Sequence, residues 1–261
     1  IINQTTYCQE VTIGTQIWQT TNLDVTTYTD GTVIPQVTDQ TAWANLTTGA
    51  WCYYNNDTAN GAIYGKLYNW YAVAGIYDST SLNNPALRKQ LAPQGWHIPS
   101  DTEWSSLINY LDPSANGGAI TPNIAGGAMK EVGTIHWLSP NIGATNESGF
   151  TGLPGGYRNF NGSFDGIGLF GIWWSSSEYY TNYYAWYRTL SSNDGFAYKS
   201  YFNKYYGMSV RCLKNSPLSN TTFDITGLKI YPNPVNRVLN VNIDNYLINQ
   251  PYTIVDVLGR F

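Results

Sequence analysis

Residues 95–111 constrain the fold of this chain more than any other part of its sequence. Ser100 can accept a hydrogen bond from the start of a helix, and Glu103, three residues later, can reach back to the Ser100 backbone, as in a capping box. Apolar side chains then recur three and four residues apart and share one helix face: Trp104, Leu107, Ile108 and Leu111. Asp112 stands before a proline, and such a residue avoids the α region. The sequence therefore predicts a helix over residues 101–111, packed by its apolar face.

The whole chain is rich in aromatic residues and poor in charge. Of its 261 residues, 22 are tyrosine and 10 are tryptophan, whereas 11% are Asp, Glu, Lys or Arg. Disordered chains have the opposite bias, so we expect a folded chain of one large or two ordinary domains. The net charge is −4 and Lys and Arg do not cluster, which argues against nucleic acid as a partner. No run of 18 apolar residues occurs, so we expect no membrane-spanning helix.

Short strands and one further helix are expected around the capped helix. Residues 11–23 alternate around Gly14 and predict a hairpin, while residues 65–74 carry apolar side chains at helical spacing. Four more runs have the β-type pattern: residues 50–54, 172–178, 185–190 and 207–213.

A change of composition after Asn215 predicts a domain boundary. Residues 216–222 are polar and contain a proline, as linkers do. A new β pattern follows, in which Leu239, Val241 and Ile243 alternate with polar residues. We therefore expect a first domain over residues 1–215, a linker over 216–227 and a β domain over 228–261.

Two groups of residues are candidate binding sites. Asn and Asp crowd the turn at residues 55–61, where the simplest interpretation is turn chemistry. The alternative is a calcium site formed by Asn55, Asp57 and Asn60, since calcium prefers oxygen ligands. The second group is aromatic and lies in the last third of the first domain. Its candidate ligand-binding residues are Tyr183, Tyr184, Trp186, Asn193, Asp194, Tyr201 and Tyr205.

Two interpretations of the aromatic group are open. The rings can pack inside the core, or they can form a binding face, because Tyr and Trp offer rigid contact area with a polar tip. The two histidines, His97 and His136, lie beside tryptophans and are expected to be structural. We find no nucleophile, base and oxyanion donor grouped as in an active site, so the sequence predicts no enzyme. The alternative is a surface hydrolase or oxidase whose site has no recognisable pattern.

Several segments in order resemble the Fibrobacter succinogenes major paralogous domain. They are IGTQIW (13–18), NL (22–23), CYYNND (52–57), YGKLYNW (64–70), GWHIPS (95–100), LPGGYR (153–158), WSSSE (174–178) and SVRC (209–212). The similarity covers about residues 9 to 214. That family resembles C-type-lectin-like and formylglycine-generating-enzyme-like domains. The resemblance implies an α+β domain with two helices, short antiparallel strands and long loops.

The chain departs from both related groups at their functional residues. Formylglycine-generating enzymes hold copper with a late cysteine pair, and Cys212 is the one late cysteine here. Sugar-binding C-type lectins hold calcium with Glu-Pro-Asn or Gln-Pro-Asp followed by Trp-Asn-Asp, and none of these motifs occurs. Neither chemistry is carried over to this chain.

The C-terminal segment resembles the sorting domain of type IX secretion cargo. The similarity lies in LKIYPNPV (228–235), LNV (239–241) and DVLGR (256–260), with the signal residues Tyr231, Pro232, Asn233, Pro234 and Gly259. The resemblance implies an incomplete Ig-like sandwich that addresses the protein to the type IX translocon and an outer-membrane shuttle barrel. It also implies an extracellular or cell-surface location in a Bacteroidetes-type bacterium.

These expectations combine into a secreted or cell-surface binding or adhesion module. Its ligand is a surface glycan or protein, with calcium as a weak candidate cofactor. Disulfides persist outside the cell, so we also expect a Cys52–Cys212 bond, because both cysteines lie in β-type runs while Cys8 lies near a chain end.

Overall fold

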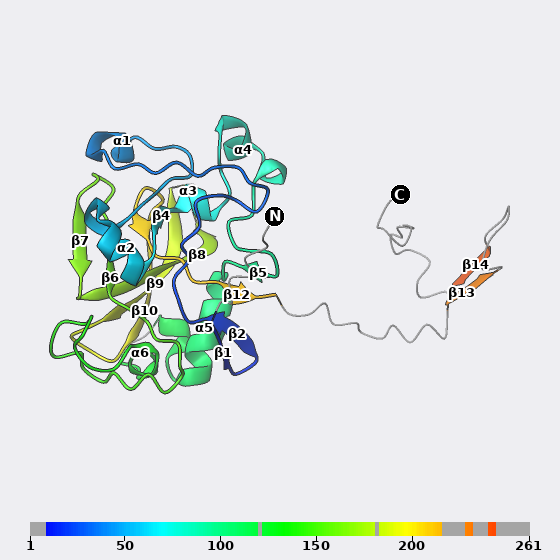
Figure 1. Ribbon diagram of the computed structural model, residues 1–261. Coiled ribbons are helices and arrows are strands. Elements are labelled where there is room, and N and C mark those ends of the chain that lie inside the picture. The colour runs from blue at the N-terminus through cyan, green and yellow to red at the C-terminus, as the bar shows by residue number, and fades with distance from the viewer. Residues whose placement is uncertain (1–8, 120–121, 181–182, 216–227, 232–239, 244–261) are drawn as a thin grey trace. The chain divides into compact units, whose positions relative to one another are not determined.

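The computed structural model describes residues 9–119, 122–180, 183–215, 228–231 and 240–243 (Figure 1). The chain divides into two compact units, Ile1–Asn215 and Ser216–Phe261. The division falls at the residue where the composition changes.

Three antiparallel sheets form the framework of the described part of the first unit. The first has the order β1 (Glu10–Ile13), β2 (Gln16–Gln19), β12 (Leu213–Lys214), β5 (Trp96–His97). The second has the order β3 (Trp51–Cys52), β4 (Leu67–Asn69), β11 (Gly207–Met208), β6 (Gly155–Arg158), β7 (Phe164–Ile167). The third has the order β10 (Ala197–Asn203), β9 (Tyr184–Ser191), β8 (Phe170–Tyr179). The expected hairpin around Gly14 is confirmed, since that glycine turns with φ 61° between β1 and β2.

The capped helix is confirmed at both ends. Helix α5 spans Asp101–Leu111, and both hydrogen bonds of the capping box are present: Ser100 Oγ accepts from Glu103 N, while the Glu103 carboxylate accepts from Ser100 N. In Figure 1, α5 lies beside the β1–β2 hairpin, and Gln16 Nε2 donates to the Glu103 carbonyl at 3.0 Å. The capping residues therefore also fix the hairpin against the helix.

The other helices are short, and together they exceed the expected number of two. The remaining α-helices of the described residues are α1 (Gln40–Ala44), α2 (Thr58–Tyr64), α3 (Trp70–Val73), α4 (Ser79–Asn83) and α6 (Ala125–Met129). The 3₁₀ turns are η1 (Tyr54–Asn56), η2 (Pro85–Leu87) and η3 (Asn116–Gly118). The mixed α+β class is confirmed, with helices and antiparallel sheets in one unit.

The expected helix over residues 65–74 is wrong for its first half. Leu67–Asn69 forms strand β4 between β3 and β11, and the helix begins at Trp70. Asn69 makes the change, because its Oδ1 accepts from Ala72 N, which caps α3, and from Ala50 N on the neighbouring segment. Gly75 follows the end of α3 with φ 72°, as expected for a helix C-terminus.

Tryptophan side chains form the centre of one of the core clusters. Trp104 of α5 lies 4.7 Å from Trp18 and 5.9 Å from Phe150, measured between ring centroids. Trp173 of β8 completes this cluster at 6.4 Å from Trp104. A second cluster contains Met208, Val210 and Cys212, which share one side of the last segment as the sequence predicts.

Buried cations hold the long loops of this unit together. Six Lys and Arg side chains are buried among the described residues: Lys66, Lys130, Arg158, Arg188, Lys204 and Arg211. Lys130 Nζ, for example, donates to three backbone carbonyls from separate segments, at Ile142, Ser191 and Asp194. The few charges of this chain therefore serve partly as internal donors, where a carbonyl without a partner would be costly.

In the second unit the structure describes one antiparallel pair, β13 (Leu228–Tyr231) with β14 (Asn240–Ile243). The sorting residues Pro232, Asn233, Pro234 and Gly259 lie outside the described residues. The expected Ig-like sandwich therefore stays a prediction.

Candidate functional site

One face of the β8–β9–β10 sheet changes character along the strands. Alternate residues of a strand share a face, so Tyr184, Trp186, Arg188 and Leu190 of β9 point to the same side. At one end Leu190 packs in the tryptophan cluster with α5. At the other end the face carries rings that are partly or largely exposed: Tyr179, Tyr184, Trp186 and Tyr201, here called the aromatic ladder. The opposite face of β9, with Ala185 and Tyr187, belongs to the core.

Strand register builds the aromatic ladder. Tyr179 lies opposite Tyr184, and Trp186 lies opposite Tyr201. Tyr179 and Tyr201 stack with centroids 3.8 Å apart and planes 6° from parallel, and Trp186 meets both edge-on at 4.7 and 5.8 Å. A hydrogen bond with Tyr201 raises the pKa of Tyr179. The rings therefore support one another, which keeps them in place while part of their surface faces solvent.

The exposure of the aromatic ladder increases toward the hairpin end of β8 and β9. Tyr184 and Tyr201 are 38% and 41% exposed, while Tyr183 and Tyr180 beyond them reach 68% and 97%. Large exposed aromatic side chains in one place are typical of binding surfaces.

An ion-pair network borders the ladder on the side of α5. Lys199 Nζ lies 4.2 Å from the Trp186 ring centroid and 2.7 Å from Asp101 Oδ2. The other Asp101 oxygen accepts from Arg188 Nη1 at 2.9 Å. Burial lowers the pKa of Arg188, an effect that Asp101 opposes. The first turn of α5 thereby anchors the cation that covers one side of Trp186.

The structure brings four of the seven predicted ligand-binding residues together and separates three. Tyr183, Tyr184, Trp186 and Tyr201 lie at the ladder. Asn193 and Asp194 lie in the turn after β9, where Asp194 accepts from Phe196 N and from the Tyr198 hydroxyl. Tyr205 packs edge-on against Tyr71 at 5.7 Å. The separation arises because Asn193 and Asp194 follow the opposite end of β9.

The residues proposed for calcium serve as turn and cap residues. Asp57 Oδ1 accepts from Ala59 N and caps α2, and Asn60 Nδ2 donates to the Tyr54 carbonyl. Asn55 adopts a left-handed conformation with φ 53°. No cluster of three His, Cys, Asp or Glu side chains suited to a metal occurs within the described residues. Calcium binding by this turn stays a prediction.

The expected Cys52–Cys212 disulfide is not formed in the structure. Both cysteines are buried, but Cys52 packs with Trp43 and Leu67 while Cys212 packs in the Met208 cluster. Burial raises the pKa of the Cys52 thiol to about 12. The β-type patterns of the two segments predict strands, but they do not specify which core cluster each cysteine side chain joins.

Both histidines pair with carboxylates. His97 Nε2 lies 2.8 Å from Glu103 Oε1, and its Nδ1 lies 2.7 Å from Asn215 Oδ1. His136 Nδ1 lies 2.9 Å from both Glu131 oxygens. His97 therefore connects the cap of α5 to the last residue of the first unit.

Sequence reasoning gave no role to Arg211, which the structure places at a cavity wall. Its segment has the β-type alternation of the last strand, and an arginine among buried residues of such a strand was the available signal.

Comparison with known proteins gives one family. The family model for the Fibrobacter succinogenes major domain matches residues 11–214. No curated protein and no solved structure matches the chain. Among the described residues, no helix is long and apolar enough to cross a membrane.

Proposed function

The chain belongs to the Fibrobacter succinogenes major domain family, and we propose that its first unit is a non-catalytic binding module that holds a glycan on the aromatic ladder. The observation that carries the proposal is the group of supported but partly exposed rings at one end of the third sheet. A pyranose ring has an apolar face that packs on an aromatic ring, and its hydroxyls need polar neighbours. The tyrosine hydroxyls and Lys199 supply such neighbours at the ladder.

The finer aspects of the proposal follow from the resemblances. We propose a C-type-lectin-like arrangement for the first unit and a type IX sorting role for the second. The protein is then cargo of the type IX translocon and its shuttle barrel, and it acts outside the cell or on the surface of a Bacteroidetes-type bacterium. The turn at Asn55, Asp57 and Asn60 is the candidate calcium site.

Binding of the whole chain to a panel of immobilised polysaccharides tests the glycan proposal. Tyr201→Ala removes a ladder ring that is 41% exposed, and Tyr110→Ala removes an exposed ring on α5 as a matched control. We expect Tyr201→Ala to weaken binding at least tenfold, about 1.4 kcal/mol, as for an aromatic residue central to an interface. Tyr110→Ala should bind as the parent does. Equal loss in both variants, or no retention on any polysaccharide, would refute the proposal.

A further inference from the structure

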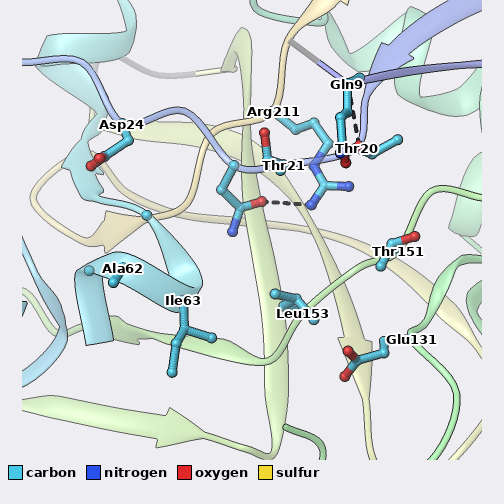
Figure 2. Close-up of a pocket in the computed structure, with 13 residues that line it drawn as sticks. Gln9, Thr20, Thr21, Asp24, Ala62, Ile63, Glu131, Thr151, Leu153 and Arg211 are labelled. Carbon is cyan, nitrogen blue, oxygen red and sulfur yellow. Dashed lines mark hydrogen bonds between the residues drawn. The ribbon is translucent and has the colours of Figure 1, made fainter. Parts of the chain in front are cut away.

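A cavity of about 390 Å³ lies on the first unit and shares no residue with the aromatic ladder. Figure 2 shows its lining, in which Arg211 lies with Gln9, Thr20 and Thr21 in the upper part of the view, above the apolar side chains of Ala62, Ile63 and Leu153; the carboxylates of Asp24 and Glu131 are also part of the wall. Its polar lining includes Thr20, Thr21, Asn22, Thr151 and Arg211. This volume is at the lower end of the range of small-molecule sites.

Arg211 is a buried cation with few partners. It is 1% exposed, and it donates from Nη1 to the Phe150 carbonyl and from Nη2 to Asn22 Oδ1 at 2.9 Å. Its Nε is buried without a hydrogen-bond partner. No carboxylate of the described residues contacts the guanidinium, which otherwise lies 4.2 Å from the Phe150 ring centroid. A buried charge without a counter-charge is costly, so something else must justify its presence.

Two other buried cations of the same unit are better satisfied. The Arg158 guanidinium donates four hydrogen bonds to backbone carbonyls, including one from Nε. Lys130 donates to three carbonyls. Neither of these side chains lines this cavity. Arg188 also has an unpaired Nε, but its guanidinium pairs with Asp101, whereas Arg211 lines the cavity and contacts no carboxylate of the described residues.

The acidic residues of the cavity wall do not neutralise Arg211, because each has its own partner. Asp24 pairs with Lys66, and the Glu131 carboxylate faces His136 Nδ1. Residues 1–8, which precede the lining residue Gln9, contain no acidic side chain. Arg211 therefore has no carboxylate partner among the residues that line the cavity.

We propose that this cavity binds a sugar acid, with the ligand carboxylate directed at Arg211 and its hydroxyls at the threonine and amide groups of the wall. A carboxylate supplies the missing counter-charge and matches the planar guanidinium. Burial lowers the pKa of Arg211 to about 9, so the guanidinium still carries its proton at neutral pH. Thr20 and Thr21 follow one another along the wall and offer hydroxyl groups to the ligand, although Thr20 Oγ1 also donates to the Gln9 carbonyl. The Asn22 amide is already held by Arg211, Trp173 and the Tyr64 carbonyl.

Calorimetric titration of the whole chain with glucuronate, glucose and acetate at pH 7 tests the proposal. We expect glucuronate to bind at least tenfold more tightly than glucose, because glucose lacks the carboxylate. We also expect glucuronate to bind at least tenfold more tightly than acetate, which lacks the hydroxyls. Equal binding of glucuronate and glucose, or no binding of either, would overturn the proposal. Equal binding of acetate would refute the sugar-acid class.

A charge at the cavity wall provides the decisive variant without disturbing the core. Ile63 lines the cavity and is 46% exposed, so Ile63→Glu should fold and should weaken glucuronate binding at least fivefold by repulsion or by occupying Arg211. Ala59→Glu adds the same charge at an exposed position of the same helix that does not line the cavity. It should leave the affinity unchanged, and an equal loss in both variants would contradict the assignment. Tyr201→Ala should also leave glucuronate binding unchanged, which separates this test from that of the aromatic ladder.

Discussion

At the scale of single residues, Arg158 shows how one buried side chain can connect distant segments of the chain through hydrogen bonds. Its guanidinium connects two segments about 120 residues apart in sequence by donating to four carbonyls. These acceptors belong to Gly162, Val37, Thr38 and Asp39. Without the donor, these mostly part-buried carbonyls would lose a hydrogen bond, at about 1–3 kcal/mol for each one left without a partner, while the Asp39 carbonyl would keep Trp43 N.

Arg158→Met should therefore lower the free energy of unfolding by at least about 3 kcal/mol. Urea denaturation of the purified chain measures this loss. Arg88→Met is the control, because Arg88 makes a partly exposed ion pair 3.8 Å long and its removal should cost about 0–1 kcal/mol. Similar losses in the two variants would show that Arg158 does not hold the loops.

The His97–Glu103 pair gives a second prediction at this scale, in the pH dependence of stability. The hydrogen bond to Glu103 raises the pKa of His97 above 6.5. Burial alone would raise the pKa of Glu103, but hydrogen bonds from His97 and Ser100 outweigh it and lower that pKa from 4.5 to about 2. The His97 contribution is complete below pH 6.5 and is lost as pH rises through the folded-state pKa. The Glu103 contribution is complete above pH 4.5 and is lost as pH falls toward 2.

The difference in unfolding free energy between the parent and His97→Gln should therefore be largest between about pH 4.5 and 6.5. It should shrink at pH 9 and at pH 2.5. Thermal or urea unfolding over this pH range measures the difference. A difference that stays constant across the range would mean that the pKa values of His97 and Glu103 do not change between the unfolded and the folded state.

At the scale of elements, α5 is expected to stabilise the fold without touching a ligand. Ser100→Ala should cost about 1 kcal/mol through loss of the cap. Trp104→Ala should cost about 3–5 kcal/mol, since its ring is fully buried among Trp18, Phe150 and Trp173. Urea unfolding measures both, with the exposed Ser106→Ala as control. Loss of glycan binding in a Ser100→Ala protein with normal stability would contradict this role.

The elements that the sequence predicted well are those fixed by neighbours in the chain. α5 has its cap, its apolar face and its stop within 13 residues, and its bounds agree with the prediction. Residues 67–69 have helical periodicity too, but pairing with β3 and β11 makes them a strand. Nothing local encodes that pairing.

The same distinction applies to the candidate sites. The crowding of aromatic residues in the sequence marks Tyr184, Trp186 and Tyr201, and the pairing of β9 with β10 brings them to one face of the sheet. Asp194 could not be separated from them without the strand register. The cavity at Arg211 depends on contacts with Phe150 and Asn22, which are 61 and 189 residues away in sequence. A single sequence carries no local signal for such contacts.

At the scale of the whole molecule, the first unit is held together as far as its last residue. The first combines three sheets of mostly short strands with long loops, and buried cations and tryptophans connect them. Its last residue is fixed as well, since Asn215 N donates to the Gly95 carbonyl and Asn215 Oδ1 lies 2.7 Å from His97 Nδ1. The polar linker begins directly after this anchor.

The last prediction concerns truncation. A chain ending at Asn220 keeps the Asn215 anchor, so its first unit should unfold at the same temperature as in the whole chain and should bind glycan equally. A chain ending at Lys214 loses both Asn215 contacts and should melt earlier.

Because the second unit carries the proposed sorting signal, the chain ending at Asn220 should fail to reach the surface of the source bacterium. Differential scanning calorimetry and surface labelling measure these outcomes. Normal surface delivery of that chain would refute the sorting role, and earlier melting of it would show that the first unit depends on the second.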